Sequence, residues 1–83
     1  MLVKQYLQKR DRTQQYKVSA IQWTGKNTED IEQFIGNFGK VEKTQITIGI
    51  HTGTINDYIV RDIMHVYYPC SEALFKRTFV EVK

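Results

Sequence analysis

One cysteine and one nearby histidine are the residues of this 83-residue chain that could act as a nucleophile and its base, and they are Cys70 and His65. Both fall near the end of one predicted strand. Side chains alternate between the two faces of a regular strand, so a spacing of five residues directs the thiol and the imidazole to opposite sides. We therefore expect no catalytic dyad, and we interpret Cys70 as a small buried side chain beside Pro69.

Metal binding and nucleotide hydrolysis lack their sequence patterns. A structural zinc site takes about four closely spaced ligands, whereas this chain offers Cys70, His51 and His65 without a Cys-x-x-Cys or His-x-x-x-His pair. None of its glycines belongs to a GxGxxG or GxxxxGK[ST] motif at the start of a helix. We predict that the protein holds no metal and no cofactor, and that it is not an enzyme.

Aromatic side chains near an arginine indicate a contact surface instead. Trp23, Tyr58, Tyr67 and Tyr68 could line an aromatic pocket, with Arg61 binding a phosphate or a carboxylate. The alternative is ordinary packing, in which each ring lies inside and its polar end stays at the rim. Because Tyr67 and Tyr68 face opposite sides of their strand, we expect at least one to be partly exposed. These five residues form the predicted ligand or partner site.

Positive charge gathers near the start of the chain. The net charge is +3, and the first 17 residues hold five cations and one acid, which leaves the other 66 residues at −1. We predict a basic N-terminal extension over residues 1–15, whose Lys4, Lys9, Arg10 and Arg12 could contact nucleic acid. A solubilising lead-in is the alternative, since no basic and aromatic stripe continues into the domain.

Composition and length indicate one small folded domain. Hydrophobic residues make up 41% and charged residues 25% of the chain, a typical profile for a globular protein. The unpaired cysteine, the absence of a signal-like stretch and the absence of a run near the roughly 20 apolar residues of a membrane span favour the cytoplasm. A core this small also favours a homodimer, in which an edge strand pairs with its copy.

Apolar spacing predicts the elements of the first half. Residues 2–10 have helix-like spacing, which predicts a short amphipathic helix or a docking arm. Residues 14–23 alternate as a strand, with Val18 and Ala20 on one face and Ile21 and Trp23 on the other. A helix should follow from residue 27 or 28, because its apolar stripe spans residues 31, 34, 35 and 38. Two glycines, at positions 36 and 39, are placed to end it in the left-handed conformation.

The second half reads as strands with one short helix. Ile46, Ile48 and Ile50 alternate with polar residues as a strand, and residues 51–54 should turn the chain. Strands are expected over residues 55–60 and 64–68, where Pro69 ends the pairing. Ser71 should cap a short helix that directs residues 74 and 75 inward, and residues 78–82 close the fold. Residues 16–83 thus predict one α+β domain: a curved, mainly antiparallel sheet of about five strands, one amphipathic helix and one short C-terminal helix.

Six short segments, taken in order, carry a family resemblance. They are AIQWTG (20–25), FIG (34–36), HTG (51–53), DYIVR (57–61), YPC (68–70) and LFKRTFVEV (74–82). Over residues 16–82 the chain resembles a family of small proteins of bacteriophages and prophages of Gram-positive bacteria. It departs from the family pattern at Asn56, where glycine is usual, and in its longer, more basic N-terminus. Asn56 can still adopt the left-handed conformation of a turn.

The resemblance implies a setting and no residue roles. It implies an accessory protein of a phage, made in the host cytoplasm, from a family with no established activity. The expected function is stoichiometric, non-enzymatic binding of a host target, either a protein or a small signalling nucleotide of a defence system. Two alternatives stay open: a nucleic-acid-binding accessory factor that uses the basic extension, and a minor structural protein of the virion.

Overall fold

The structure is a computed structural model that describes residues 3–11, 13 and 15–82. The elements of this part are, in chain order, β1 (Lys4–Gln8), β2 (Val18–Gln22), α1 (Thr28–Ile35), the 3-10 turn η1 (Gly36–Phe38), β3 (Lys40–Val41), β4 (Gln45–Ile48), β5 (His51–Thr54), β6 (Tyr58–Arg61), β7 (Tyr67–Cys70), α2 (Glu72–Thr78) and β8 (Phe79–Glu81). None of the helices in these ranges has the length and apolar character needed to cross a bilayer.

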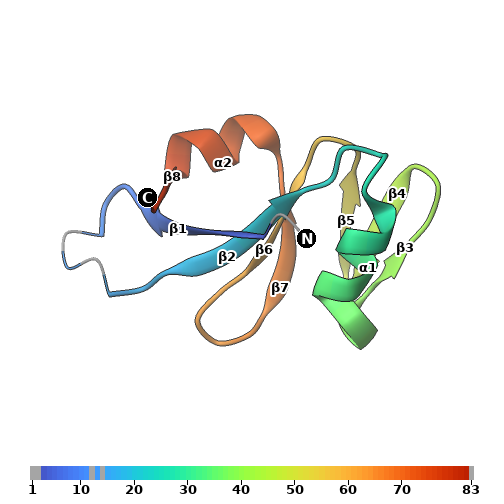
Figure 1. Cartoon of the computed structure of the whole chain (residues 1–83), viewed down its shortest axis with the longest axis horizontal. Coiled ribbons are helices and arrows are strands. Elements are labelled where there is room, and N and C mark those ends of the chain that lie inside the picture. The colour runs from blue at the N-terminus through green and yellow to red at the C-terminus, as the bar shows by residue number, and fades with distance from the viewer. Residues whose placement is uncertain (1–2, 12, 14, 83) are drawn as a thin grey trace.

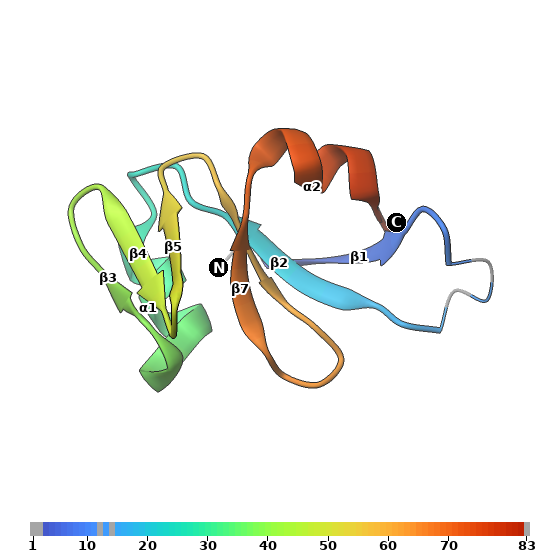
Figure 2. The same ribbon diagram turned by 180° about the vertical axis from the view of Figure 1, so that it is seen from behind.

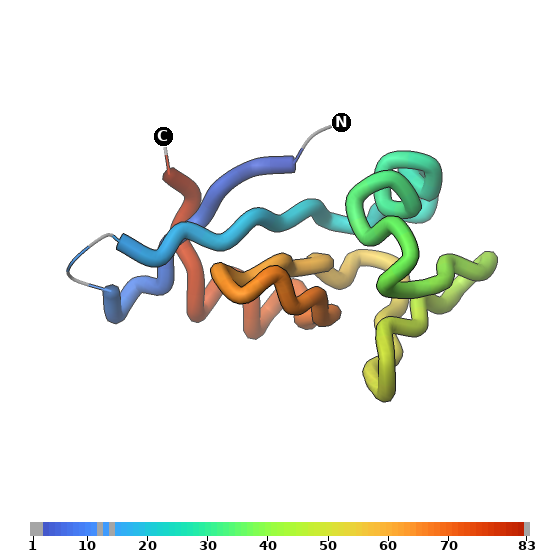
Figure 3. The backbone as a smooth tube through the Cα atoms, turned by 90° about the horizontal axis from the view of Figure 1, so that it is seen from below, coloured from blue at the N-terminus to red at the C-terminus, as the bar shows by residue number. Residues whose placement is uncertain are grey.

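Two antiparallel sheets make up the α+β fold, which confirms the predicted class (Figure 1). Five strands pair in the order β7-β6-β2-β1-β8, and three more pair in the order β3-β4-β5. The second sheet was not predicted. The molecule measures 38 × 24 × 23 Å. The connection between β1 and β2 lies at one end, and α1 with the second sheet lies at the other (Figures 1 and 3).

The N-terminal segment is a strand, so the predicted amphipathic helix is wrong. β1 lies inside the five-stranded sheet, where Tyr6 pairs with Val18 of β2 and Leu7 with Val80 of β8. Tyr6 and Leu7 are adjacent, so they point to opposite faces of β1. Apolar residues on both faces suit a strand that lies inside a sheet. The predicted boundary at residue 15 therefore does not separate an arm from the domain, since β1 belongs to the sheet.

The two faces of β2 meet two different cores, as the predicted alternation requires. Val18 and Ala20 join the cluster beneath α2, which also contains Val60, Cys70, Phe75 and Phe79. Ile21 and Trp23 join the cluster beneath α1, which also contains Ile31, Phe34, Ile35, Ile46, Ile48 and Ile59. The sheet therefore separates two small apolar cores, and β2 contributes to both.

The first helix begins as predicted and ends earlier. Ile31, Phe34 and Ile35 are buried on one stripe. Gly36 has φ +55° and ψ −128°, a positive-φ conformation that glycine adopts without strain, and it ends α1 after Ile35. Gly39 is extended, so neither of the two predicted glycine stops has the left-handed helical conformation that was expected. The turn through η1 takes Phe38 off the buried stripe and leaves it 64% exposed.

The predicted turn over residues 51–54 is wrong, because these residues form β5. β4 and β5 pair as a hairpin that joins Ile48 to His51 through two residues, Gly49 and Ile50. Gly49 has φ +61°, which matches the glycine preferred at the first position of a two-residue type II′ turn. The strand predicted to run through Ile50 therefore ends at Ile48, and Ile50 is 95% exposed at the turn.

The strand predicted over residues 64–68 is displaced toward the C-terminus. Met64 and Val66 lie in the loop before β7, where the Asp62 carboxylate accepts hydrogen bonds from their N–H groups at 2.9 and 3.0 Å. Pro69 does not end the pairing, since it lies inside β7 opposite Ile59. β7 is an edge strand, and an edge tolerates a residue without an N–H donor.

The second helix is capped as predicted but faces the sheet differently. The Ser71 hydroxyl accepts a hydrogen bond from the Leu74 N–H at 3.3 Å. Phe75 is buried and stacks on Tyr58 with ring centroids 4.0 Å apart. Leu74, which was also predicted to point inward, is about half exposed. Adjacent helix positions are about 100° apart, and the rotation of α2 that buries Phe75 turns Leu74 toward the surface.

These neighbouring residues of α2 give a test of the core assignment. Phe75→Ala should lower the free energy of unfolding by about 3–5 kcal/mol, because it removes a buried ring and leaves a cavity. Leu74→Ala, one position away on the exposed side, should change it by less than about 1 kcal/mol. Urea unfolding of both variants measures the difference. Equal losses would contradict the orientation of α2.

Candidate functional site

The five predicted site residues do not form one pocket. Register places Arg61 opposite Tyr67 and Val60 opposite Tyr68, so the two tyrosines face opposite sides of β7, as predicted. Tyr67 packs against the core beneath α1, whereas Tyr58 and Tyr68 pack against the core beneath α2. The structure therefore brings Arg61 and Tyr67 together and separates them from the other two tyrosines.

Trp23 is a structural residue and cannot contact a ligand. Its side chain is fully buried. Its backbone N–H donates to the Asp57 carbonyl at 2.9 Å, and its carbonyl accepts from the Asn56 N–H at 2.6 Å. The indole N–H donates to the Thr28 hydroxyl at 3.4 Å. These bonds connect the end of β2 to the start of α1 and to the turn before β6.

Tyr58 and Tyr68 are also committed to packing. Tyr58 stacks on Phe75 at 4.0 Å, and the Tyr6 ring meets both of them edge-on, at 6.4 Å from Tyr58 and 4.8 Å from Phe75. Tyr68 is partly buried against the same core. Burial raises the pKa of the Tyr68 hydroxyl, with smaller contributions from Cys70 and Asp62. Both phenols thus serve the core beneath α2.

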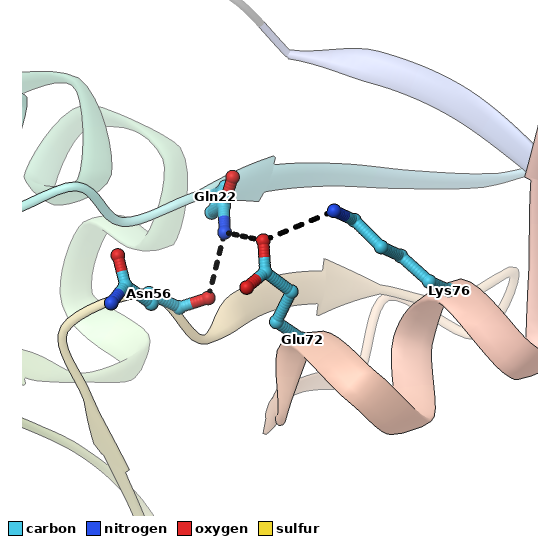
Figure 4. A network of polar contacts seen from close by, with 4 residues as sticks. All are labelled: Gln22, Asn56, Glu72 and Lys76. Carbon is cyan, nitrogen blue, oxygen red and sulfur yellow. Dashed lines mark hydrogen bonds and ion pairs between the residues drawn. The ribbon is translucent and has the colours of Figure 1, made fainter.

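A polar junction beside Tyr58 connects three elements (Figure 4). The Gln22 amide donates to the Asn56 carbonyl at 2.9 Å and to a Glu72 carboxylate oxygen at 2.8 Å. The Lys76 ammonium pairs with that carboxylate at 3.2 Å. The hydrogen bond from Gln22, followed by Lys76, lowers the pKa of Glu72. Because these groups bond to one another, the junction stabilises the fold and offers little to a ligand.

Arg61 and Tyr67 belong to a cluster that sequence reasoning only half identified. The Tyr67 ring stacks on Phe38 with centroids 5.1 Å apart and meets Phe34 edge-on at 5.5 Å. The Arg61 guanidinium lies over the Phe34 ring, 5.4 Å from its centroid, and donates to the Ser19 hydroxyl at 3.3 Å. No carboxylate pairs with Arg61 in the part of the chain that the structure describes.

A surface hollow of about 380 Å³ lies beside this cluster. It is lined by apolar side chains and by both histidines: Phe38, Ile48, Ile50, Val66, Tyr67, His51 and His65. Among the described residues, no acidic side chain lines it. We use the name aromatic surface for Phe38, Ile50, Arg61, Val66 and Tyr67 together. They come from η1, the β4–β5 turn, β6, and β7 with its preceding loop.

Three side chains of the aromatic surface were missed by sequence reasoning. Phe38 and Ile50 were assigned to buried faces and Val66 to a strand, yet each is more than half exposed. Exposed apolar residues that gather at one place are typical of interaction sites, whereas single ones are not. Gly49 was the available signal, since a glycine before an isoleucine also fits a hairpin turn.

The candidate catalytic residues, Cys70 and His65, also lie in two different environments. Cys70 is buried in β7 and His65 lies in the exposed loop before it, with φ +61°. Burial, followed by Asp57, raises the pKa of the Cys70 thiol, which disfavours the nucleophilic thiolate. Within residues 3–11, 13 and 15–82, no group of three or more His, Cys, Asp and Glu side chains could hold a metal.

The predicted nucleic-acid contacts do not act as one set. Lys4 pairs with Glu81 at 3.6 Å across the β1–β8 pairing. Lys9 and Arg10 line a different hollow, together with Arg77. Arg12 lies outside the described residues. The basic character of the N-terminal segment is therefore divided between an ion pair and a hollow.

Comparison with known proteins adds no assignment. We found no protein-family model, no curated protein and no solved structure that matches the chain. A function for this chain is therefore inferred from its residues and their geometry.

The buried phenols predict a loss of stability in alkali. Burial raises the pKa of Tyr6 and Tyr68 above the ordinary value of 10.0. A raised pKa stabilises the fold below the ordinary value, and this stabilisation is lost as pH rises through the raised value. The melting temperature should fall between about pH 9 and pH 11, and less steeply in Tyr6→Phe/Tyr68→Phe, which keeps both rings. Identical slopes would contradict the assignment.

Proposed function

We propose that the chain is a non-enzymatic phage accessory protein that binds a host protein in one-to-one stoichiometry through the aromatic surface. The observation that carries the proposal is the stack of the exposed Phe38 ring on the partly buried Tyr67 ring beside Arg61. Aromatic residues and arginine dominate the few positions that supply most of the binding energy in protein interfaces. The phage setting and the host cytoplasm are supported by the family resemblance alone.

The surface specifies the chemistry of its partner. The apolar hollow accommodates an aliphatic or aromatic side chain, because its lining offers mostly carbon atoms. Arg61 has N–H groups beyond the one that bonds Ser19, and no carboxylate in the described part of the chain pairs with it. A partner carboxylate could form a charge-assisted pair there. We therefore expect a partner segment with an apolar anchor and an acidic neighbour.

A protein fits this surface better than a signalling nucleotide does. Phosphate groups are held by several cationic or N–H donors that converge on them. Among the described residues, the lining of this hollow is apolar apart from His51 and His65, and Arg61 belongs to the neighbouring cluster over Phe34 and does not line it. A hollow of this kind suits a side chain of a folded partner.

Affinity capture from host cells tests the proposal. The tagged chain should retain one host protein in equal amounts, and Ile50→Asp or Phe38→Ala should lower its retention at least tenfold. Such losses follow because truncating a central interface residue costs about 2 kcal/mol or more, roughly 30-fold in affinity. Leu74→Asp is the matched control, since Leu74 is also an exposed apolar residue but lies on α2.

Two results would overturn the proposal. One is a captured protein that Ile50→Asp retains as well as Leu74→Asp does. The other is a dimer of the chain that Ile50→Asp dissociates, because the aromatic surface would then be covered by a second copy. Sedimentation of each purified variant distinguishes these cases, and circular dichroism confirms that each variant is folded.

A further inference from the structure

Three cations from two distant segments converge at the other end of the molecule. Lys9 and Arg10 follow β1, and Arg77 lies in the last turn of α2. Together with Gln8 and Thr78 they line a hollow of about 380 Å³. We call these three cations and their hollow the basic hollow. It lies far from the aromatic surface, since β1 ends at one end of the long axis and α1 with the second sheet lies at the other (Figure 2).

The backbone fixes the position of the basic hollow. The Lys9 N–H donates to the Thr78 carbonyl at 2.9 Å, which joins the turn after β1 to the end of α2. The pairing of Gln8 with Phe79 continues this contact into the sheet. Figure 2 shows the end of α2 lying over the end of β1. The cations are therefore held together by the fold itself, whereas the sequence placed Lys9 and Arg10 in an N-terminal extension outside the domain.

No acidic group in the described part of the chain neutralises the basic hollow. Its lining contains no Asp or Glu, and none of its three cations forms an ion pair there. Asp11 is close in sequence but lines a separate hollow, where its carboxylate accepts from the Thr13 N–H and hydroxyl at 3.0 and 2.7 Å. Like charges that the fold holds close together repel one another, and a bound anion removes that repulsion.

The helix end does not by itself explain the cluster. The C-terminal end of a helix favours a cation in its own last turn, which accounts for Arg77. Lys9 and Arg10 come from another segment, and the Thr78 carbonyl beside them is already occupied by the Lys9 N–H. An anionic ligand accounts for all three.

We propose that the basic hollow binds the phosphate backbone of a nucleic acid. Three exposed cations from two segments suit successive phosphates of a chain, and among the described residues the lining has no aromatic ring on which a base could stack. The contact is therefore expected to be independent of sequence. Lys4 is not part of this site, because it pairs with Glu81. This inference does not depend on the proposed protein partner.

Fluorescence anisotropy with labelled 20-base-pair DNA tests the site. Three phosphate contacts predict a slope of about −2.7 for the logarithm of affinity against that of salt, or roughly 40-fold weaker binding between about 50 and 200 mM. Lys9→Ala/Arg10→Ala/Arg77→Ala should abolish binding at the lower salt. Lys26→Ala/Lys40→Ala/Lys43→Ala is the matched control, because it removes three exposed lysines elsewhere and also lowers the net charge from +3 to zero.

Each alternative outcome is decisive. Equal losses in the two triple variants would show that net charge alone attracts DNA, and absent binding at low salt would remove the site altogether. Inorganic phosphate is the probe for a single anion: if it displaces DNA from the wild type better than sodium chloride at the same ionic strength, the hollow is a site for one phosphate group and the backbone assignment is wrong. The proposal is supported if the control variant binds DNA as the wild type does and Lys9→Ala/Arg10→Ala/Arg77→Ala does not.

Discussion

The fold depends on Trp23, which packs in one core with residues of both sheets. This residue is fully buried at the end of β2, where the chain leaves the five-stranded sheet for α1. Its backbone exchanges hydrogen bonds with Asn56 and Asp57 just before β6, and its indole reaches Thr28 at the start of α1. One residue, through its backbone and its side chain, thereby fixes a helix, a turn and a strand relative to one another. This joint sets the distance between the side chains of α1 and those of β6.

The three-stranded sheet also packs closely against β7, through β5. A Cβ atom on Gly53 of β5 would lie 2.8 Å from the Pro69 side chain, so no larger residue fits without a shift. This approach, with the Trp23 joint, makes η1, the β4–β5 turn and the loop before β7 converge. The aromatic surface lies where they meet, and its Phe38 and Ile50 are exposed because η1 and the β4–β5 turn take them off the buried faces. The surface is a consequence of how the sheets join.

Sequence reasoning succeeded where the signal is local. The Ser71 cap, the buried stripe of α1 and the two-faced alternation of β2 each follow from residues within a few positions of one another. It failed where distant segments decide: β1 forms because β8, at the other end of the chain, pairs with it. It also placed Ile50 in a strand, since an apolar residue after Gly49 fits a strand and a hairpin turn equally well. Arg77 is absent from the predicted nucleic-acid contacts, because nothing in the sequence indicates that it meets Lys9.

The central claim is that the joint between the sheets presents a surface for one host protein, and site-specific photo-crosslinking tests it most directly. A photoreactive amino acid at position 50, in the host cells where we propose the chain acts, should give one discrete adduct with a host protein. The same group at position 74, also exposed but on α2, should give none. Adducts at both positions, no adduct at position 50, or an adduct with the mass of two copies of the chain would contradict the account.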